Sequence, residues 1–544
     1  MLARNLAALE VRNTDTVARL VAATPRDVRF VHSRSGHRIP ELTGDVSGPT
    51  ALHSRYDPIR EAHRLPQFAR HSHGFFAFLG LGAGYHIREF LDRGTTTGAW
   101  IVEADAGLAR AVMEQVDLTP ILADPRTTLL VGESVDAAAS KLPAAYLPAV
   151  DGDLHTVNLT SLTRVRPTYF RELIAELQRV MEQVAVDYTT QAAFGGRWFA
   201  NILANLPRVE EASRTTHLPS PTSRRALVVG AGPGAEGVRD RLTGDTAGNR
   251  SSIIACDSAL PSLARAGLAP DYVVSVDCQH ASYHHWMALA AGERGVATVL
   301  DVASPPIVAR HAAQPLFFAG GHPMTQYLAQ HWLSLPSLPT DGGNVGYAAV
   351  AFAQSLGFDS IDLAGLDYAY ARKRYARGAD MYTSMARLQS RHAPIEHQDM
   401  AAILRSSPQR RRRAGGTVYE TAQLVRYRRS LAALLSERSP TPPVAPWQAT
   451  APPLVSWRQT LQQLRDALLR LPDPQLPLRG YLEGLRPAHR DLITIMLPAA
   501  ASLHRREAHT AVSEEGQDAA ELIEQTRTWS ISLIERTIRG GGEV

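Results

Sequence analysis

Apolar runs that end in polar residues recur four times in the middle of the chain. They lie at 227–236 (LVVGAGPGAE), 253–260 (IIACDSAL), 271–279 (DYVVSVDCQ) and 342–368 (GGNVGYAAVAFAQSLGFDSIDLAGLDY). Short apolar runs that alternate with helical patterns predict a parallel, doubly wound α/β sheet. Ligands of such sheets bind outside the carboxyl ends of the strands. The four endings therefore predict a polar crevice along one edge of a central sheet.

The N-terminal part shows a second set of strand and helix patterns. Residues 75–91 (FFAFLGLGAGYHIREFL) predict a strand, a glycine turn and a helix, and 100–105 and 127–132 predict two further strands. In 169–188 apolar residues recur every three or four positions, which is typical of an amphipathic helix. We expect this helix to bridge two α/β parts.

Proline-containing stretches and helical patterns divide the rest of the chain. The polar stretch 213–225 is a plausible boundary, and 438–455 is rich in proline and expected to be extended and semi-rigid. Amphipathic helices are predicted at 457–471 and 519–538. The predicted organisation is an N-terminal α/β domain (1–165), bridging helices (166–224), a central Rossmann-like domain (225–406) and a mostly helical C-terminal domain (407–544).

Composition narrows the class of protein. The chain of 544 residues is 44% hydrophobic and 20% charged, as in globular proteins, and it is long enough for two or three domains. It has no apolar run long enough to cross a membrane, and charged residues interrupt the first apolar stretch, so no secretory signal is expected. Two cysteines are too few for a disulfide framework or a structural zinc site. We expect a cytoplasmic protein without a bound metal.

Charge is nearly balanced, at a formal net of +4, apart from the run Arg410 to Arg413. Such a run could contact nucleic acid or an anionic lipid surface. A nucleic-acid footprint is normally a patch spread over a face. We interpret the run as a solvated loop between domains and expect no nucleic-acid partner.

The first central run carries a glycine loop, Gly230, Gly232 and Gly234, before a helix. Glycines let backbone N–H groups approach a phosphate, and a helix N-terminus favours an anion. Pro233 removes one N–H donor but fits the first position of a helix. A tight turn without a ligand remains the alternative.

Three further strand ends carry carboxylates, Asp257, Asp277 and Asp367. Each Asp could simply cap the helix that follows. Three such ends on one edge favour a ligand crevice, because a buried carboxylate needs hydrogen bonds or water. The stretch that begins at Asp341 and runs through Gly343 and Asn344 opens a small-residue helix and predicts a second anion site.

Taken in order, these signals resemble the domain shared by motility-associated factor proteins and the 6-hydroxymethylpterin diphosphokinase-like family. Segments 52–64, 79–87, 101–105 and 194–206 are similar to the N-terminal and bridging parts of the motility-associated factors. The resemblance covers about residues 1 to 430. It implies a glycosyltransferase that puts a nonulosonic, sialic acid-like sugar on Ser or Thr of flagellin and so supports flagellum assembly.

The same order of signals resembles bacterial lipooligosaccharide sialyltransferases, which use a CMP-activated sugar and require no cofactor. The resemblance implies a CMP phosphate site at the glycine loop, ribose or cytosine contacts at the strand ends and donor contacts at the helix start. This chain has Asp257 and Asp277 where those enzymes tend to have Asn. The implied nucleotide-sugar residues are Gly230, Gly232, Pro233, Asp257, Ser258, Asp277, Gln279, Gly343 and Asn344.

The sialyltransferases also use a His base and tyrosines on the departing phosphate. Here the corresponding segment 391–400 contains His392 and His397, and His397 lies where the base would fall. A histidine with a pKa near neutrality can take a proton from a hydroxyl. A surface histidine is the alternative. The implied catalytic set is His397, Asp367, Tyr368 and Tyr375, with Tyr370 as a further tyrosine.

Two other functions stay open. One is an ATP-dependent 6-hydroxymethylpterin diphosphokinase, in which Asp257, Asp277 and Asp367 would hold Mg²⁺. The other is a flagellin-binding protein without turnover, because the C-terminal part departs from the motility-associated factor pattern. Separately, Gly80, Gly82 and Gly84 with Glu103 resemble an S-adenosylmethionine fingerprint, although an α/β turn without a cofactor is favoured.

Overall fold

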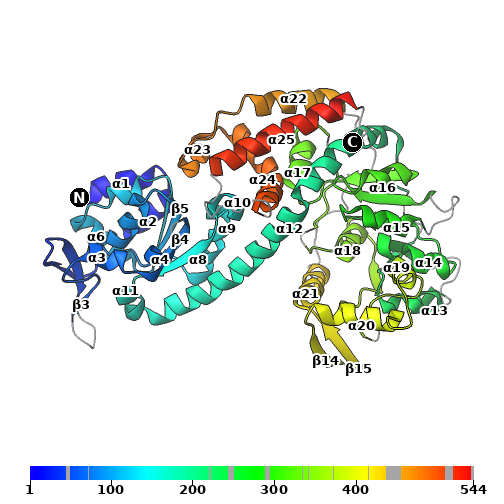
Figure 1. The fold of residues 1–544 in the computed structure, drawn as a ribbon, viewed down its shortest axis with the longest axis horizontal. Helices are drawn as coiled ribbons and strands as arrows, with labels where there is room; N and C mark the ends of the chain where they lie inside the picture. Colours follow the sequence, from blue (N-terminus) through cyan, green and yellow to red (C-terminus); the bar gives the residue numbers. More distant parts are fainter. Residues whose placement is uncertain are drawn as a thin grey trace. The chain divides into compact units, whose positions relative to one another are not determined.

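The protein folds into two units that do not follow the order of the chain. The structure, a computed structural model, describes residues 1–43, 49–71, 73–219, 221, 223–242, 250–287, 295–333, 335–340, 342–371, 373–413, 416–436, 447, 455–508 and 519–540. Unit 1 comprises Met1–Gly195 and Leu471–Thr528, and unit 2 comprises Gly196–Arg470 and Trp529–Val544. Asp341 and most of the proline-rich segment lie outside the described residues. Figure 1 labels the elements in chain order.

Unit 1 is built on a parallel sheet of four strands in the order β6-β5-β4-β7. Every residue of β4 is buried, as expected of a parallel strand covered on both faces. A small antiparallel sheet precedes it. The strands are β1 (Val28–His32), β2 (Arg38–Leu42), β3 (Thr50–Ala51), β4 (Gly74–Leu79), β5 (Thr96–Glu103), β6 (Thr127–Val131) and β7 (Leu154–Asn158).

The helices of unit 1 come from both ends of the chain. The predicted helix 169–188 lies inside α12, a single long helix. The elements are α1 (Leu2–Glu10), α2 (Thr14–Ala22), α3 (Pro58–His63), α4 (Pro66–Arg70), α5 (Tyr85–Asp92), α6 (Ala106–Gln115), α7 (Thr119–Leu122), α8 (Val135–Ser140), α9 (Leu142–Ala145), α10 (Pro148–Asp151), α11 (Thr160–Val165), α12 (Pro167–Thr215), α23 (Leu478–Gly484), α24 (Pro487–Ala508) and α25 (Ala519–Arg539). The division between the units falls inside α12 and α25.

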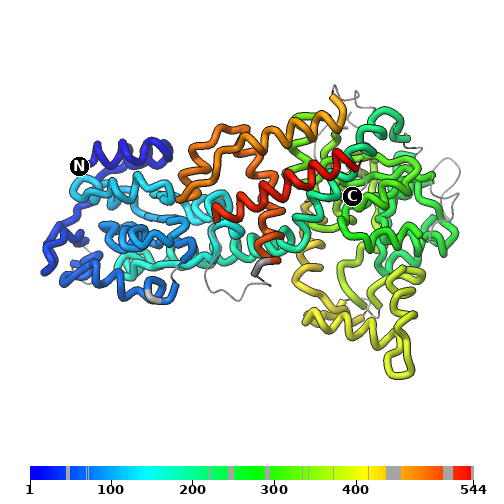
Figure 2. The backbone as a smooth tube through the Cα atoms, turned by 45° about the horizontal axis from the view of Figure 1, so that its top comes forward, coloured from blue at the N-terminus to red at the C-terminus, as the bar shows by residue number. Residues whose placement is uncertain are grey.

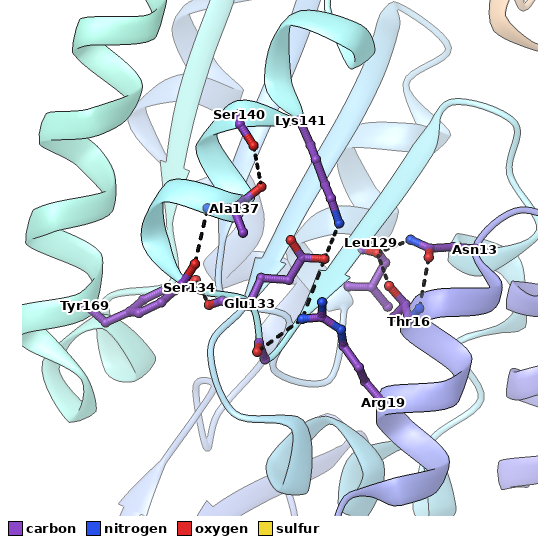
Figure 3. A network of polar contacts seen from close by, with 11 residues as sticks. Asn13, Thr16, Arg19, Leu129, Glu133, Ser134, Ala137, Ser140, Lys141 and Tyr169 are labelled. Carbon is purple, nitrogen blue, oxygen red and sulfur yellow. Dashed lines mark hydrogen bonds and ion pairs between the residues drawn. The ribbon is translucent and has the colours of Figure 1, made fainter. Parts of the chain in front are cut away.

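A buried glutamate follows strand β6 in unit 1. Figure 3 shows Lys141, which directly follows α8, and Arg19 of α2 pointing toward the Glu133 carboxylate. Lys141 pairs with Oε1 of Glu133, and Arg19 Nη1 lies 3.8 Å from the same oxygen. The Tyr169 hydroxyl donates to the Glu133 carbonyl at 3.0 Å. These contacts tie α2, α8 and α12 to one edge of the sheet, and a buried carboxylate needs such partners.

Unit 2 is built on a parallel sheet of six strands in the order β12-β11-β10-β9-β8-β13. This arrangement confirms the predicted α/β class with a doubly wound parallel sheet. The chain runs outward from β8 to β12 and then returns to the other side of β8, so the topological switch point lies between β8 and β13. The strands are β8 (Arg225–Val229), β9 (Ser252–Cys256), β10 (Tyr272–Ser275), β11 (Ala297–Asp301), β12 (Gln314–Phe318) and β13 (Ser360–Ala364).

The helices of unit 2 include one that is buried almost throughout. In α18 the residues from Gly346 to Ala353 are all buried, because their small and apolar side chains pack against the sheet. The elements are η1 (Pro233–Gly237), α13 (Val238–Leu242), η2 (Asp257–Ala259), α14 (Leu260–Arg265), η3 (His280–Ser282), α15 (Tyr283–Trp286), α16 (Pro306–His311), α17 (Pro323–His331), α18 (Val345–Ser355), α19 (Asp380–Arg387), α20 (Ile395–Arg405), α21 (Ala422–Ser436) and α22 (Trp457–Leu469).

The arginine run is not a loop. Gln409–Arg413 forms strand β14, which pairs with β15 (Gly416–Glu420) in an antiparallel hairpin. Every residue of β14 is exposed, so the run is solvated as expected, but it has regular structure. Figure 2 follows this yellow part of the backbone, and Figure 1 places the hairpin beside α20 and α21.

Among the described residues, no helix is both long enough and apolar enough to cross a membrane.

Candidate functional site

The carboxyl ends of β8, β9 and β13 lie side by side at the switch point of the six-stranded sheet. Val229, the last residue of β8, pairs with Ala364 of β13 and with Ala255 of β9. The glycine loop after β8 and the segment after β13 therefore leave the sheet together. This is where the four sequence signals were expected to converge.

The glycine loop packs directly on the exit of β13. The Gly230 N–H donates to the Ala364 carbonyl and the Gly232 N–H to the Gly365 carbonyl, both at 2.8 Å. A Cβ on Gly232 would lie 2.1 Å from Asp367 Oδ2, so only glycine fits this close approach. Pro233 begins the short helix η1, as its fixed φ predicts.

The Asp367 side chain contacts this loop as well as solvent. Its Oδ2 accepts a hydrogen bond from the Gly234 N–H at 3.1 Å, although the residue is exposed. The carboxylate thus occupies a donor of the loop that was expected for a phosphate. A phosphate that binds the Gly234 N–H would have to displace the Asp367 carboxylate. The roles expected of the glycine loop and of Asp367 remain predictions.

Asp257 is buried at the end of β9 with both oxygens engaged. Oδ1 accepts from the Ser258 N–H at 2.7 Å, and Oδ2 accepts from the Ser275 hydroxyl at 2.6 Å. Burial raises the pKa of Asp257, positive charge on His285 opposes the rise, and Asp277 adds to it. The structure therefore brings Asp257 and Ser258 together with a histidine that the sequence reasoning missed.

His285 lies on the short helix α15, which packs near η2. Its Nδ1 is buried and has no hydrogen-bond partner among the described residues. The half-buried imidazole of His285 therefore lies near the buried Asp257 carboxylate, with one ring nitrogen unpartnered among the described residues. The signal in the sequence was the pair His284 and His285, which follows the strand end at Asp277.

Asp277 and Gln279 are placed differently from Asp257. Asp277 is exposed, and its Oδ1 accepts from the Gln279 N–H at 2.9 Å. The side chain of Asp277 therefore remains accessible for a ribose or base contact. From the other side, Asn201 of α12 donates to the Cys278 carbonyl at 3.0 Å and to the Ala303 carbonyl at 2.9 Å, which fixes the loops after β10 and β11.

The start of α18 forms a closed cap. Asn344 Oδ1 accepts from the Tyr347 N–H at 3.0 Å and from the Tyr368 hydroxyl at 2.9 Å. Gly343 has a positive φ of 70°, and a Cβ there would lie 3.1 Å from the Tyr427 ring. The helix start predicted from Gly343 and Asn344 is confirmed as a helix start, whereas its ligand remains a prediction.

Tyr368 joins this cap from the segment after β13. It has a positive φ of 45°, which is uncommon for a tyrosine and marks a constrained backbone. Burial raises the pKa of the Tyr368 phenol, and Cys256 and Tyr427 add to the rise. The phenol therefore keeps its proton at physiological pH and remains a hydrogen-bond donor. A leaving phosphate, whose oxygens are acceptors, would need such a donor.

Tyr375 lies in a separate network. Its N–H donates to the Tyr382 hydroxyl at 3.2 Å, and the Arg374 guanidinium lies 5.1 Å from its ring centroid. Arg374 pairs at 2.7 Å with Asp399, a buried carboxylate of α20. This network anchors α19 and α20, and among the described residues no hydrogen bond or ring contact links Tyr375 to Tyr368.

His397 is exposed in the first turn of α20, and His392 is exposed just before that helix. Neither side chain has a hydrogen bond or an ion pair among the described residues. The geometry therefore gives His397 access to solvent but no orienting partner. Its role as a base remains a prediction.

Asp301 is a second group that the sequence reasoning missed. It ends β11, is buried, and accepts from the Ala303 N–H at 2.8 Å. Burial raises the pKa of Asp301 to about 7. The run Thr298 to Asp301 is an apolar run that ends in Asp, so the rule applied to the other strands would have found it.

The glycine loop of unit 1, at Gly80, Gly82 and Gly84, is packed against other residues of the same unit. A Cβ on Gly82 would lie 2.5 Å from His53 Nε2, which accepts from the Ala83 N–H at 2.9 Å. Glu103 is buried and accepts from the N–H groups of Leu81 and Asp105 at 3.1 and 3.0 Å. Backbone groups thus use the donors and the carboxylate that a cofactor would need, which favours a structural turn.

In the part of the chain that the structure describes, no group of three or more His, Cys, Asp or Glu side chains is arranged to hold a metal ion. The acidic strand ends Asp257 and Asp367 instead accept hydrogen bonds from protein donors.

Comparisons with known proteins place the central domain. Residues 200–373 match the family described as 6-hydroxymethylpterin diphosphokinase MptE-like. Two relatives from Treponema pallidum (strain Nichols), both called uncharacterized protein, are 29% and 31% identical over 170 and 159 residues. These alignments cover 31% and 28% of this chain, and 79% and 54% of the relatives, so the chain spans about half the length of the second relative.

A solved structure matches the whole chain. It is described as the structure of MAf glycosyltransferase from Magnetospirillum magneticum AMB-1, and the match has a TM-score of 0.61 at 15% identity. It covers 100% of this chain and 97% of the other. At this identity the match shows a shared fold. The resemblance seen in the sequence is confirmed at that level: the chain carries an MptE-like central domain within the fold of the motility-associated factor proteins.

Proposed function

We propose that the protein is a cytoplasmic glycosyltransferase that moves a nonulosonic acid from a CMP donor to Ser or Thr of flagellin. The observation that carries the proposal is the full-length fold shared with a MAf glycosyltransferase, together with polar strand ends at the switch point of the MptE-like sheet. Ligands of doubly wound sheets bind at this edge. The donor and acceptor come from the family resemblance.

The reaction would be a displacement at the anomeric carbon. The acceptor oxygen forms a new bond to that carbon, its proton goes to a base, and the bond to the CMP oxygen breaks. Tyr368, a protonated phenol, could donate a hydrogen bond to the departing phosphate if its single O–H turned from Asn344 Oδ1 to the phosphate oxygen. Asp277, exposed beside the edge, suits the ribose hydroxyls.

Binding of CMP to the purified full-length chain tests the donor site. Asp277→Asn should weaken CMP binding about tenfold, because hydrogen bonds to a charged group contribute ~1.5–3 kcal/mol. Asp362→Asn is the matched control. Asp362 is exposed on β13, and its 3.4 Å pair with Arg225 should add little. Absence of CMP binding by calorimetry would contradict the proposal.

Two histidines compete for the role of base, and separate variants distinguish them. His397→Gln is expected to lower kcat by about 10²–10⁴-fold if it takes the acceptor proton, with CMP affinity unchanged. His285→Gln tests the alternative from the geometry beside Asp257. His392→Gln is the control, because His392 is equally exposed near α20. The readout is the mass of flagellin incubated with each variant and a CMP-nonulosonate.

The MptE-like match supports a second candidate, an ATP-dependent diphosphokinase acting on 6-hydroxymethylpterin. That activity would need Asp257, Asp277 and Asp367 to hold Mg²⁺, whereas in the described part of the chain these carboxylates are not grouped to hold a metal ion. Formation of AMP from ATP only when the pterin and Mg²⁺ are present would favour this candidate. CMP binding in the presence of a chelator, followed by a mass gain of flagellin, would exclude it as the main activity, whereas flagellin binding without any transfer would indicate a protein without turnover.

A further inference from the structure

The positive charge of the chain is concentrated in one segment. Residues 405–429 contain eight arginines and one carboxylate, that of Glu420, whereas the formal net charge of the whole chain is only +4. The remainder of the chain is therefore acidic on balance. Four of the arginines are consecutive and form the exposed strand β14.

Most of this charge has no internal partner. Arg413 and Arg428 both pair with Glu420. The side chains of Arg410 and Arg412 have no hydrogen bond or ion pair within the described part of the chain, and the side chain of Arg411 has only a 3.0 Å hydrogen bond to Gln409. The like charges on this strand repel one another, which destabilises the folded hairpin. A partner of opposite charge would relieve this repulsion.

Strand β14 has one unpaired edge. Its neighbour β15 is paired on both sides: one edge pairs with β14, and at the other edge Tyr419 exchanges two backbone hydrogen bonds with Tyr370, at 2.9 and 2.7 Å. Within the described residues β14 has β15 as its only neighbouring strand. An edge strand presents a row of unpaired N–H and C=O groups that can bind another chain.

We propose that β14 binds an acidic, extended polypeptide segment as an added strand. Side chains alternate between the two faces of a strand, so Arg410 and Arg412 lie on one face and Arg411 and Arg413 on the other. An added strand has side chains on both faces and can place carboxylates beside all four arginines. A flat membrane can meet only one face, and a second copy of the strand is repelled by its like charges.

The hairpin and the helix after it belong to the same unit as the candidate site and contact the segment that follows β13. Tyr370, which pairs with Tyr419, comes three residues after Asp367. Tyr427 of α21, the helix after the hairpin, lies with its ring centroid 6.3 Å from that of Tyr368. A segment held on β14 would therefore be tethered to the elements that form the crevice. In its link to transfer the inference rests on the proposed function, and we assign the segment to the acceptor protein.

The binding step is tested with the full-length protein and a labelled ten-residue peptide, EETTEETTEE, which carries Glu side chains on both faces of an added strand. Fluorescence anisotropy should show binding that weakens as salt is raised. The triple variant R410Q/R411Q/R412Q should bind about tenfold more weakly, since exposed ion pairs contribute ~0.2–1 kcal/mol each. The corresponding triple Lys variant should retain most of the binding. The control R29Q/R164Q/R171Q removes the same charge from exposed arginines elsewhere and should leave binding unchanged.

A second peptide separates strand addition from simple charge attraction. The same sequence with alternate backbone nitrogens methylated keeps its carboxylates but cannot pair along one edge. It should bind at least about tenfold more weakly, at ~1 kcal/mol per lost hydrogen bond. Equal binding of both peptides would overturn the inference, as would tighter binding of an oligothymidylate or of phosphatidylglycerol vesicles. Failure of this test would leave CMP binding intact, whereas failure of the proposed function would abolish CMP binding and leave peptide binding intact.

Discussion

At the residue scale, the informative side chains are carboxylates buried at strand ends. Asp257 has both of its oxygens occupied by protein donors, whereas Asp301 has one hydrogen bond, from Ala303. Burial without a charged partner disfavours the ionised form, which explains the raised pKa of Asp301, at about 7. Such groups cluster at functional edges, and they also make folding stability depend on pH.

Asp301 should lower the stability of the protein as the pH rises. In the folded state its pKa is about 7, against 3.8 in the unfolded chain, so between these values the folded state binds more protons. The free energy of unfolding contributed by this group therefore falls from about pH 4 to about pH 7 and is flat above that. Asp301→Asn removes the penalty, so the variant should gain stability relative to the parent at pH 8, on the order of a few kcal/mol, and little at pH 4.

Thermal unfolding at pH 4, 6 and 8 checks this expectation. Asp271→Asn serves as the control, because Asp271 is only half-buried and interacts with Arg250 at 3.3 Å. A stability difference between Asp301→Asn and the parent that does not change with pH would show that the Asp301 carboxyl is not neutral in the folded protein.

The same residues show what the sequence could and could not reveal about the site. The polar endings after β8, β9, β10 and β13 were identified because an apolar run that ends in Asp or Gly is a local pattern. The partners of these residues could not be identified from the sequence, because they are distant along the chain. Asp257 interacts with Ser275 and His285, and Asp367 accepts from the Gly234 N–H. The loop donors expected for a phosphate are partly used by protein acceptors, which only the folded arrangement shows.

At the element scale, the start of α18 couples helix stability to the candidate site. Asn344 is the N-cap and at the same time holds the Tyr368 hydroxyl. Elements with strong local periodicity, such as β4, β8 and α18, were predicted from the sequence. β11 and β12 were not singled out, and the arginine run was read as a loop, because the pairing of β14 with β15 depends on cross-strand contacts rather than on apolar alternation.

Asn344→Ala should lower the free energy of unfolding by about 1–2 kcal/mol, because the N-cap acceptor is lost. It should also weaken CMP binding if Tyr368 contacts the donor, since Tyr368 then loses the partner that orients it. Urea denaturation and calorimetry with CMP measure the two effects. Asn13→Ala is the matched control: Asn13 caps α2 in unit 1, and its loss should reduce stability without changing CMP affinity.

Asn344→Asp gives a further check on the cap. A carboxylate still accepts from the Tyr347 N–H and is as good an N-cap as Asn, so stability should be retained. An Asn344→Ala protein with unchanged stability and unchanged CMP binding would show that neither the cap nor the Tyr368 contact matters in solution.

At the scale of the whole molecule, the C-terminal part of the chain is shared between the two units. Residues 471–528 belong to unit 1 with the N-terminal residues, whereas α22 and the last residues belong to unit 2. In unit 2 the Trp457 N–H donates to Glu210 at 2.6 Å, and the Trp332 indole donates to the Val455 carbonyl at 3.0 Å. Domains predicted from a sequence are consecutive segments. Local patterns therefore could not reveal that residues 471–528 return to unit 1.

A partly buried ion pair joins the returning segment to the rest of unit 1. Arg479 of α23 lies 3.2 Å from a carboxylate oxygen of Asp151, and its guanidinium lies 5.1 Å from the Phe75 ring centroid. Asp151 is buried, so Arg479→Met leaves a buried carboxylate without its charge partner and should cost about 3–5 kcal/mol. The exposed Arg486, changed to Met, should have almost no effect.

The double variant Arg479→Met with Asp151→Asn separates the charge from the packing. Removing the carboxylate's charge together with its partner relieves the cost of an unpaired buried ion, so the double variant should recover much of the stability that Arg479→Met loses. Urea denaturation of the four proteins in this cycle measures the coupling between the two residues. If the double variant is no more stable than Arg479→Met, the segment 471–528 is held to unit 1 by packing alone, and the ion pair contributes nothing to the return of the chain.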